Sequence, residues 1–541
     1  MQVSVIIQTR GWSERLEGNL ESLAQQTLES SDFEVILLDY SLENLEDRLA
    51  QMALPCSWRV IKQAGSSRGT ALNRGVEAAS GRFCLFLRDD IKADPGLLAE
   101  HLHVQQEKSG ALGIGMVRYT PKEGAGWYAR QFSRWQNERI STLTLGEREP
   151  TWADCTLTNL CAPRQAIQAT GNFCTHLEHG YDVELAFRLE QDGLCCTFIP
   201  SAAGVSEEAH SFATLASETR ERGAAYVSLW CHQPATLSGL LGSFYDTSLR
   251  GIVLRRLLLL LRLPPVLLAF PSLLLGKYDR GWEWFKFLQS YCFWYGVRHA
   301  LPDRRMWRRL THGTPILMYH AFADVGEVPS RYVLPQRCFA WQMALLKRLG
   351  YQVISLEEYL VCLHESRLPP ERALVITIDD GYLDNYLLAY PVLRRYGFTA
   401  TIFLVTGGDR NNWDEDGPLA GRPAMTASQA RELQRAGISF GAHTRTHPRL
   451  PEISTEQAWE EISGAKADLE KELGVPVQTF AYPHGKENEA IQTQVEQAGY
   501  LGACGVGRGL NTPAAPPFAL YRTEIIGTAS LLQFLQSVLS G

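Results

Sequence analysis

Short runs of hydrophobic residues alternate with longer amphipathic segments along two stretches of this chain. In residues 1–240, four runs predict buried strands: Val3–Ile7, Phe33–Leu38, Phe83–Leu87 and Cys196–Ile199. Three segments there predict helices: Glu14–Gln26, Thr70–Ala79 and Asp182–Asp192. Residues 313–541 repeat the alternation, with strands at Ile316–Tyr319, Leu374–Ile378, Ala400–Val405 and Ser439–Gly441 and helices at Phe339–Leu349, Thr426–Ala436 and Thr455–Leu473. This pattern indicates α/β domains, each with a largely parallel sheet covered by helices.

Residues 241–312 break the pattern and predict an apolar helical connector. The stretch Ile252–Leu275 is the most apolar, but arginines and prolines interrupt it, and Arg255 and Arg262 would share one helical face. Its longest charge-free run, Leu263–Gly276, would span only about 21 Å as a helix, less than the ~30 Å core of a bilayer. Aromatic residues and arginines follow, a composition typical of interfacial segments. Three interpretations stay open: a hairpin packed on the preceding domain, peripheral membrane contact through residues 250–310, and a spanning helix.

Composition and charge exclude several classes of protein. The 541 residues are 45% hydrophobic and 21% charged, which excludes disorder, collagen and long coiled coils. A net charge of −7 has the wrong sign for a dedicated nucleic-acid binder. The 12 cysteines are scattered and form no C-x-x-C pair, which fits a reducing compartment better than a disulfide framework. The chain opens directly on a strand-like run, so we expect no cleavable export signal and a cytoplasmic protein.

Acidic residues mark the ends of the predicted strands in the N-terminal domain. Asp39 follows the second strand, the pair Asp89-Asp90 follows the third, and Asp182 opens a helix. Such positions face the crevice in which parallel sheets bind ligands. Adjacent acids there favour a cation, and hard oxygen ligands select Mg²⁺ or Mn²⁺, which could bridge a diphosphate. A solvated acidic turn is the alternative explanation for Asp89-Asp90.

The order of these features resembles the family 2 inverting glycosyltransferases of the GT-A fold. The resemblance covers roughly residues 2–212 and rests on the segments Val3–Arg10, Glu34–Ser41, Ala71–Gly75, Gly81–Asp90, Asn159, Gly171–Phe173 and His179–Leu185. It implies that Thr9 and Asp39 bind the nucleotide, with Asp89 in the same nucleotide-sugar site. It also implies that Asp90 and His210 belong to a metal–diphosphate site, and that Asp182 deprotonates the acceptor hydroxyl.

Three positions depart from the pattern of that family. Arg88 stands at the first position of the usual D-x-D, Tyr181 replaces the Glu of the usual E-D, and Gln8-Thr9-Arg10 replaces the usual P-T-Y. Because Asp182 is retained, we still expect sugar transfer, although Arg88 departs from the usual metal-binding motif.

The C-terminal domain carries a second set of metal-binding residue types. Asp379 and Asp380 end an apolar strand, and His443-Thr444-Arg445-Thr446-His447 follows another. Two histidines and one aspartate suit Zn²⁺, or another divalent first-row ion, with coordination positions left open as in catalytic sites. The second aspartate is then free to act as a base on water. The alternative is a histidine-rich surface turn beside an acidic strand end.

This segment resembles the polysaccharide deacetylases of carbohydrate esterase family 4, also called NodB-like, over about residues 313–540. The resemblance rests on Pro315–His320, Thr377–Tyr382, the H-T-R-T-H segment, Phe480–Gly485 and Ala498–Tyr500, in a form usual for enzymes acting on poly-N-acetylglucosamine-like glycans. It implies a distorted (β/α) barrel with Asp379 as general base and Asp380, His443 and His447 as metal ligands. The backbone near Tyr482 would form part of an oxyanion hole.

Two features of that family are absent, and the proton donor is therefore unassigned. Ala481 replaces the arginine of the third motif, and Leu520–Glu524 replaces the late Leu-x-His. His320 and His484 are candidate donors, and Arg522 is a candidate for orienting Asp379.

The two resemblances together leave two hypotheses. In the first, a GT-A domain (residues 1–240) transfers an N-acetylated sugar from a nucleotide-sugar donor to a glycan or lipid-linked glycan, and the deacetylase domain (residues 313–541) removes the acetyl group. A variant of it has the two activities on different steps of one surface-glycan pathway. In the second, the deacetylase alone is catalytic and the N-terminal domain binds sugar nucleotides or acts as a scaffold. We expect the protein at the inner face of the cytoplasmic membrane.

Overall fold

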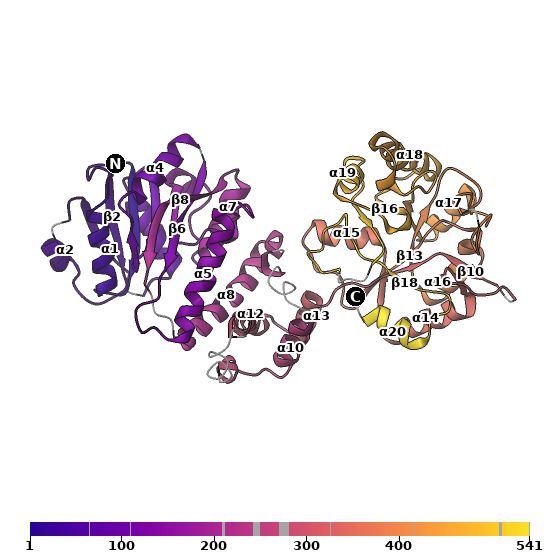
Figure 1. Cartoon of the computed structure of the whole chain (residues 1–541), viewed down its shortest axis with the longest axis horizontal. Coiled ribbons are helices and arrows are strands. Elements are labelled where there is room, and N and C mark those ends of the chain that lie inside the picture. The colour runs from indigo at the N-terminus through magenta and orange to yellow at the C-terminus, as the bar shows by residue number, and fades with distance from the viewer. Residues whose placement is uncertain are drawn as a thin grey trace. The chain divides into compact units, whose positions relative to one another are not determined.

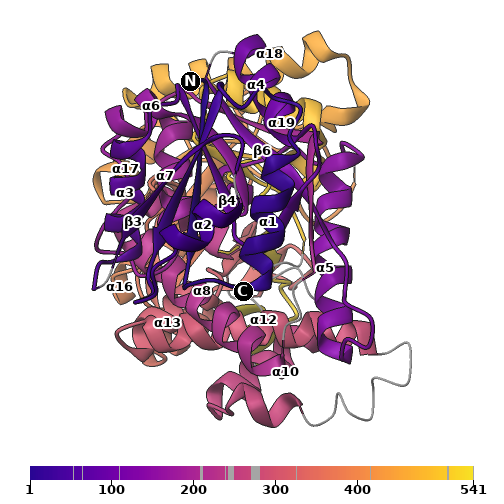
Figure 2. The same cartoon turned by 90° about the vertical axis from the view of Figure 1, so that its left-hand side faces the viewer.

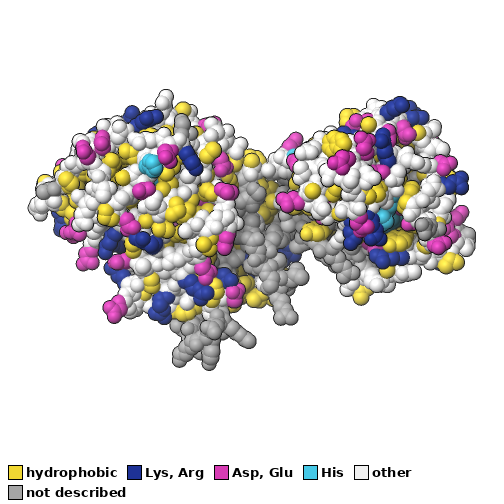
Figure 3. All heavy atoms as spheres, turned by 45° about the horizontal axis from the view of Figure 1, so that its top comes forward, with side chains coloured by type: hydrophobic (Ala, Val, Ile, Leu, Met, Phe, Trp, Pro, Cys, Tyr) yellow, Lys and Arg dark blue, Asp and Glu magenta, His cyan; other side chains and the backbone are white. Residues whose placement is uncertain are grey.

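The computed structural model describes the chain except residues 53, 64, 109, 208–210, 238, 242–248, 270–280, 325, 415, 508–510 and 540–541. The predicted ligand His210 therefore lies outside the described residues. The contacts within the chain divide it into two compact units, Met1–Ala300 and Leu301–Gly541, drawn in Figure 1 and turned by 90° in Figure 2. Acidic and basic side chains are interspersed over the face of each unit that Figure 3 shows.

The first unit is built on an eight-stranded mixed sheet. Its strands, in spatial order, are β3 (Ser57–Lys62), β2 (Phe33–Asp39), β1 (Val3–Thr9), β4 (Phe83–Arg88), β7 (Asn159–Pro163), β6 (Ala111–Tyr119), β8 (Cys195–Ser206) and β5 (Ile91–Ala93). The first four are parallel, and β7 runs antiparallel to both β4 and β6. The inner strands β2, β1 and β4 are almost entirely buried, as expected where helices cover both faces, whereas the edge strand β3 is partly exposed.

Helices cover both faces of this sheet, and each face has its own hydrophobic core. The helices of the unit are α1 (Glu14–Ala24), α2 (Glu46–Met52), α3 (Arg68–Ala78), α4 (Leu97–Glu107), α5 (Trp127–Thr144), α6 (Arg164–Ala169), α7 (Tyr181–Gln191), α8 (Phe212–His232), α10 (Leu249–Leu260) and α12 (Gly281–Ala300). One core contains residues of α1, α4, α5 and α12, and the other contains residues of α3, α6 and α7. The predicted α/β class and the mixed GT-A-like sheet are confirmed.

The described residues of the predicted connector are largely helical, and those up to Ala300 belong to the first unit. Glycines bring α8 and α12 close together: a Cβ on Gly223 would lie 2.1 Å from the Phe293 carbonyl oxygen, and one on Gly296 would lie 2.0 Å from that of Arg220. Buried Thr219 also donates to Gln289 at 2.9 Å. This packing matches the first of the three interpretations of the connector.

One expectation for the connector is wrong. Helix α10 ends at Leu260 and Arg262 has a positive φ of 53°, so Arg255 and Arg262 do not share a helical face. Arg255 is fully buried and donates to Ser290 of α12. Within the described residues, no helix combines the length and the apolar character needed to cross a membrane.

The second unit contains a curled, all-parallel sheet. Its strands run in the order β17 (Gly502–Cys504), β16 (Thr479–Ala481), β15 (Ser439–Ala442), β14 (Thr401–Leu404), β13 (Ala373–Ile378), β9 (Ile316–Tyr319) and β18 (Thr523–Glu524), and β12 (Gln352–Ile354) also pairs with β13. An isolated parallel bridge joins Cys504 to Leu520, just before β18. The two edges of the sheet thus approach each other, as in a distorted barrel, and the predicted fold class is confirmed.

Helices surround this sheet, and its strand ends carry the predicted site. They are α13 (Arg304–Thr311), α14 (Gln336–Arg348), α15 (Leu356–His364), α16 (Tyr390–Tyr396), α17 (Ala427–Arg435), α18 (Thr455–Leu473), α19 (Glu489–Gln497) and α20 (Leu531–Leu539), and β10 (Ala321–Ala323) pairs with β11 (Val333–Pro335) beside them. Along β13, Leu374, Ile376 and Ile378 join the core under the helices, while Ala373 and Val375 join a second cluster on the opposite face. This alternation gives Asp379 the same face as Thr377.

Candidate active sites

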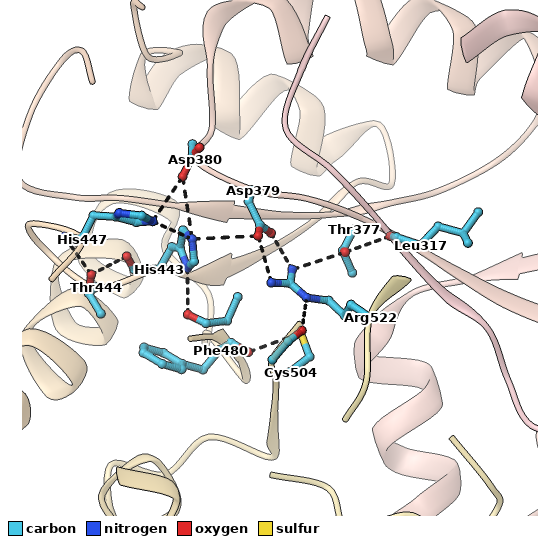
Figure 4. A network of polar contacts seen from close by, with 12 residues as sticks. Leu317, Thr377, Asp379, Asp380, His443, Thr444, His447, Phe480, Cys504 and Arg522 are labelled. Carbon is cyan, nitrogen blue, oxygen red and sulfur yellow. Dashed lines mark hydrogen bonds and ion pairs between the residues drawn. The ribbon is translucent and has the colours of Figure 1, made fainter. Parts of the chain in front are cut away.

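A buried ion pair holds Asp379 at the carboxyl end of β13. The guanidinium of Arg522 donates to Oδ1 of Asp379 at 2.5 Å and to Oδ2 at 2.9 Å, and both side chains are almost fully buried. Arg522 also donates to the Gly505 carbonyl at 3.0 Å and to the Thr377 hydroxyl at 3.4 Å. These two contacts hold the guanidinium in place, and it in turn orients both carboxylate oxygens of Asp379 (Figure 4).

Asp380, His443 and His447 converge on one point beside this pair (Figure 4). Nε2 of His443 and Nε2 of His447 each lie 3.7 Å from Oδ1 of Asp380 and 3.2 Å from each other. Their ligand atoms all lie within 4.8 Å of one another, and no other described residues form such a group. The structure thus brings together the three residues that the sequence suggested as metal ligands.

The backbone of the histidine loop is held by two separate groups. Thr444 donates to the His443 carbonyl at 2.5 Å and accepts from the His447 amide at 3.0 Å. Glu461 of α18 accepts from the amides of Arg445 and Thr446 at 2.7 and 2.9 Å. These contacts turn the loop so that residues four apart in sequence present their rings to the same point.

Several residues of the site have a left-handed backbone. Asp380, Thr444, His447 and His484 have φ values of 71°, 65°, 60° and 56°. Non-glycine residues rarely adopt this conformation, which costs roughly 1–3 kcal/mol each and persists only where the surroundings impose it. Its concentration around one cluster indicates that the fold is strained here in order to place these side chains.

The electrostatics favour a cation at the cluster. Burial, reinforced by the charge of Asp379, raises the pKa of Asp380 to about 8. Burial lowers the pKa of His443 to about 4, and burial with the neighbouring His443 and His484 lowers that of His447. Burial alone would raise the pKa of Asp379, but Arg522, His443 and His320 outweigh it and hold that pKa below its usual value.

These residues fit a divalent first-row ion. Nδ1 of His443 donates to the Ala481 carbonyl at 2.8 Å, which leaves Nε2 as the atom with a lone pair facing the cluster. Oδ1 of Asp380 is buried without a hydrogen-bond partner, and this costly state is relieved when a cation binds there. Two neutral imidazoles and one carboxylate form a donor set typical of catalytic zinc sites.

The remaining predicted residues of this domain border the cluster in different ways. The ring of His484 lies 4.6 Å from that of His447. Burial lowers the pKa of His320, while the charge of Asp379 opposes this shift. The Tyr482 amide donates to the Cys504 carbonyl at 3.1 Å, and its hydroxyl donates to Phe518 at 2.9 Å. Both donors of Tyr482 are thus engaged within the domain, so Tyr482 itself does not offer a donor for an oxyanion.

The loop between β14 and α17 adds residues that the sequence analysis missed. The ring of Trp413 lies 5.2 Å from that of His447. Asn411 donates to the Tyr382 hydroxyl and to Asp414, both at 2.8 Å, and Tyr382 in turn hydrogen-bonds Asp380. Only the tight grouping of aromatic and polar residues at 411–414 could have signalled this wall of the site.

In the first unit, the strand ends bring the predicted nucleotide residues together. Thr9 and Asp39 are register partners at the carboxyl ends of β1 and β2, and both are buried. Asp39 accepts from Lys62 at 2.5 Å and from the Ser41 amide at 2.8 Å. Asp89 follows β4 and is half-buried.

The predicted Mg²⁺ or Mn²⁺ site does not fit the described residues. Asp90 is buried, and the Arg88 guanidinium donates to both of its carboxylate oxygens, at 2.6 Å for Oδ2. The Ser206 hydroxyl donates to Oδ2 at 2.5 Å. The arginine at the first position of the D-x-D motif thus neutralises the acid at its last position, so the prediction of Asp90 as a metal ligand is not supported.

A cavity of about 920 Å³ contains Asp182 and extends to Arg88. Asp182 lies in the first turn of α7, and burial raises its pKa despite hydrogen bonds from nearby backbone amides. The wall carries more basic than acidic side chains: Arg10, Arg68, Arg88, Arg139, Arg148, Arg222 and Lys286, against Asp154, Asp182, Glu218 and Glu221. A basic cavity in an acidic chain suits an anionic ligand.

Part of this cavity wall comes from the segment predicted to be a connector. Lys286, Gln289, Ser290 and Phe293 of α12 line the cavity. Because α12 is in contact with α8, whose residues line the same cavity, the helix is a structural part of this site rather than only a link.

Comparisons with known proteins divide the chain in the same way. The family model of glycosyl transferase family 2 matches residues 4–170, and that of polysaccharide deacetylase matches residues 366–503. The chain joins a glycosyltransferase family 2 domain to a polysaccharide deacetylase domain. The first match contains Thr9, Asp39 and Asp90, and the second contains Asp379 and both histidines of the cluster, whereas Asp182 and Arg522 lie outside the matches.

Individual proteins are similar to parts of the chain. The polysaccharide-deacetylase relative YxkH of Bacillus subtilis is 29% identical over 211 residues, 39% of this chain and 71% of YxkH. The poly-β-1,6-N-acetyl-D-glucosamine N-deacetylase of Staphylococcus aureus is 25% identical over 189 residues, 33% of this chain and 62% of that protein. The chain thus spans less than two thirds of the second relative. A mannosyltransferase of Pyrobaculum calidifontis, solved with GDP-mannose and Mn²⁺, is 14% identical, with a TM-score of 0.39 over 56% of this chain and 88% of that one.

Proposed function

We propose that the chain is a bifunctional carbohydrate enzyme that transfers an N-acetylated sugar from a nucleotide-sugar donor and removes the acetyl group from a glycan. The observation that carries the deacetylase half is the convergence of Asp380, His443 and His447 next to the ion-paired Asp379. The transferase half is supported by Asp182, which lies in a basic cavity of the other unit. A poly-N-acetylglucosamine-like glycan is the proposed substrate, as for the staphylococcal relative.

In the deacetylase domain, Asp380, His443 and His447 would hold the ion, which supplies Lewis-acid chemistry when bound. Asp379 takes the proton of the attacking water, because Arg522 keeps its carboxylate ionised and oriented. His484 and His320 are the proposed donors of a proton to the leaving amine. A backbone amide near Tyr482 is proposed to stabilise the oxyanion.

In the transferase domain, Thr9, Asp39 and Asp89 are proposed to bind the nucleotide at the carboxyl ends of β1, β2 and β4. Asp182 is proposed to take the proton of the acceptor hydroxyl. Burial raises the pKa of Asp182, which makes it a stronger base than an exposed carboxylate. The acceptor is a glycan or a lipid-linked glycan.

The second candidate function leaves only the deacetylase catalytic. Arg88 and Tyr181 favour it, because both replace acidic residues usual in the transferase family. Asp182 favours the bifunctional enzyme, because it lies in the cavity with access to ligand.

Contact with the inner face of the cytoplasmic membrane through residues 250–310 is part of the proposal. It is supported by apolar side chains on and after α10 that lie exposed, namely Leu257, Leu260, Leu261, Val266 and Leu267. Flotation with anionic vesicles tests it: the double variant Leu260→Glu and Leu261→Glu should reduce the bound fraction, and equal binding of both proteins would contradict the proposal.

The function is tested with the purified full-length chain. In one incubation it is given nucleotide sugars, and the released nucleoside diphosphate is measured. In a separate incubation it is given an N-acetylglucosamine oligomer, and the released acetate is measured. Release of both supports the bifunctional enzyme. Acetate release without any sugar transfer would support the deacetylase with a non-catalytic N-terminal domain.

A further inference from the structure

The contact between Arg88 and Asp90 has consequences for how the transferase domain binds its donor. Arg88 ends β4 and is a register partner of Gln8 on β1, the strand that continues into Thr9 and Arg10. It therefore lies at the edge of the sheet where ligands of such folds bind. Its side chain is about one-third exposed and lines the cavity, while Asp90 behind it is buried.

A divalent ion could bind Asp90 only if the hydrogen bonds from Arg88 and Ser206 to the Asp90 carboxylate were broken. Arg88 donates to both carboxylate oxygens, and Ser206 donates to one of them. A guanidinium stays protonated at every physiological pH, so a cation placed at Asp90 would also be repelled by a permanent positive charge. Among the described residues, the group able to hold a metal is the one in the deacetylase domain.

Other arginines share the cavity with Arg88. Arg10 follows β1, and Arg68 begins α3 and hydrogen-bonds the hydroxyl of Tyr181. A planar guanidinium group matches the geometry of a phosphate group and can donate two parallel hydrogen bonds to its oxygens. The pair of Arg88 with Asp90 has no net charge, so Arg10 and Arg68 give this part of the cavity lining its positive charge.

We propose that the transferase domain binds the diphosphate of its donor through Arg88, Arg10 and Arg68, without a divalent cation. The inference rests on the proposed function. In the transfer step, the bond from the sugar carbon to the diphosphate oxygen breaks and a bond from the acceptor oxygen to that carbon forms. The acceptor proton passes to Asp182, and the leaving nucleoside diphosphate gains one negative charge, which the arginines stabilise.

The test measures binding of UDP, GDP, CDP and dTDP to the full-length protein by calorimetry, once with EDTA and once with Mg²⁺ or Mn²⁺. We expect at least one nucleotide to bind, with dissociation constants that agree within about threefold between the two conditions. Arg88→Ala should weaken binding by about tenfold or more, because a charged hydrogen-bonding group is lost. Arg118→Ala is the matched control, since Arg118 forms a comparable pair with Asp94 outside the cavity.

A further variant, Arg88→Asp, restores an acidic residue at the first position of the motif. It should lose binding in EDTA and regain part of it with Mn²⁺. If the natural chain binds a nucleotide only when Mg²⁺ or Mn²⁺ is present, the inference is wrong and the proposed function stands. If no nucleotide binds in any condition, the proposed transferase function itself is contradicted, and the inference is overturned together with it.

Discussion

The ion pair between Arg522 and Asp379 allows the deacetylase mechanism to be tested by a single substitution. Arg522→Met removes the charged guanidinium and keeps only part of the aliphatic stem of the side chain. Asp379 is then left ionised in a buried site without its partner, and breaking a buried pair in this way costs about 3–5 kcal/mol. An opposite charge at this distance lowers a carboxyl pKa by about 1–3 units, so the pKa of Asp379 should rise by that amount.

The sign of the pH dependence follows from this shift. In the natural chain the pKa of Asp379 lies below its usual value, so its ionised form stabilises the fold above the usual carboxyl pKa. This contribution is lost as the pH falls through the lowered pKa. The stability deficit of Arg522→Met should therefore be largest near neutral pH and shrink on acidification. Denaturant unfolding with EDTA present measures it without a contribution from bound metal.

The pH profile of acetate release provides a second test of the same substitution. A protonated Asp379 cannot accept a proton from water, so the acidic limb of the pH profile of acetate release should move upward by about 1–3 pH units. The control is Arg331→Met, which removes an exposed pair with Glu524 and should cost about 0–1 kcal/mol. A pH profile that is the same in Arg522→Met and the natural chain would refute the assignment of Asp379 as the base that Arg522 keeps ionised.

Three further outcomes are expected. His443→Ala should lose both bound metal and acetate release, whereas Asp379→Asn should keep the metal and lose about 10²–10⁴ in rate. Elemental analysis of the two variants separates these roles. Equal metal loss in both variants would show that Asp379 is a metal ligand. Metal affinity measured by calorimetry should rise with pH up to about 8, because Asp380 must lose a proton to bind; an affinity independent of pH between 6 and 8 would contradict this. Asp182→Asn should abolish sugar transfer and leave acetate release intact, and normal transfer would show that Asp182 is not the base.

The strands and helices that the sequence predicts are present in both domains, because their patterns are strong and local, whereas β3, β5, β6 and β7 of the first unit were not predicted. The apolar run before Asp379 forms the predicted buried strand, β13, and the segment Thr455–Leu473 forms the predicted helix, α18, with a capping box at Ser454 and a left-handed glycine at Gly474. The connector was harder to predict. Its apolar character fits both a lipid surface and a protein core, and it is the close approach at Gly223 and Gly296, with the hydrogen bond from Thr219 to Gln289, that shows α12 packed on α8.

The candidate sites likewise contain some residues that the sequence could indicate and others that it could not. Residue types and order pointed to His443, His447 and one of the two neighbouring aspartates, because these residues follow recognisable strands, and the family resemblance selected Asp380 as the ligand. The wall made by Asn411 and Trp413 could not be predicted, because it lies in a loop whose path depends on tertiary contacts. Nor could the left-handed backbone of Asp380 be predicted, since nothing in its local sequence requires it.

The two domains use the same two residue types, a pair of neighbouring aspartates and one arginine, with opposite consequences. In the deacetylase domain Arg522 approaches from a distant strand region and pairs with the first aspartate, Asp379, which leaves Asp380 turned toward the histidines. In the transferase domain the arginine comes from the same strand end, as Arg88, and pairs with the second aspartate, Asp90. The acid that could have held an ion is thus neutralised by a residue two positions away. A pair of neighbouring aspartates at a strand end therefore does not by itself predict a metal site. In these two domains, the arginine that pairs with one aspartate determines which carboxylate stays available for a metal ion.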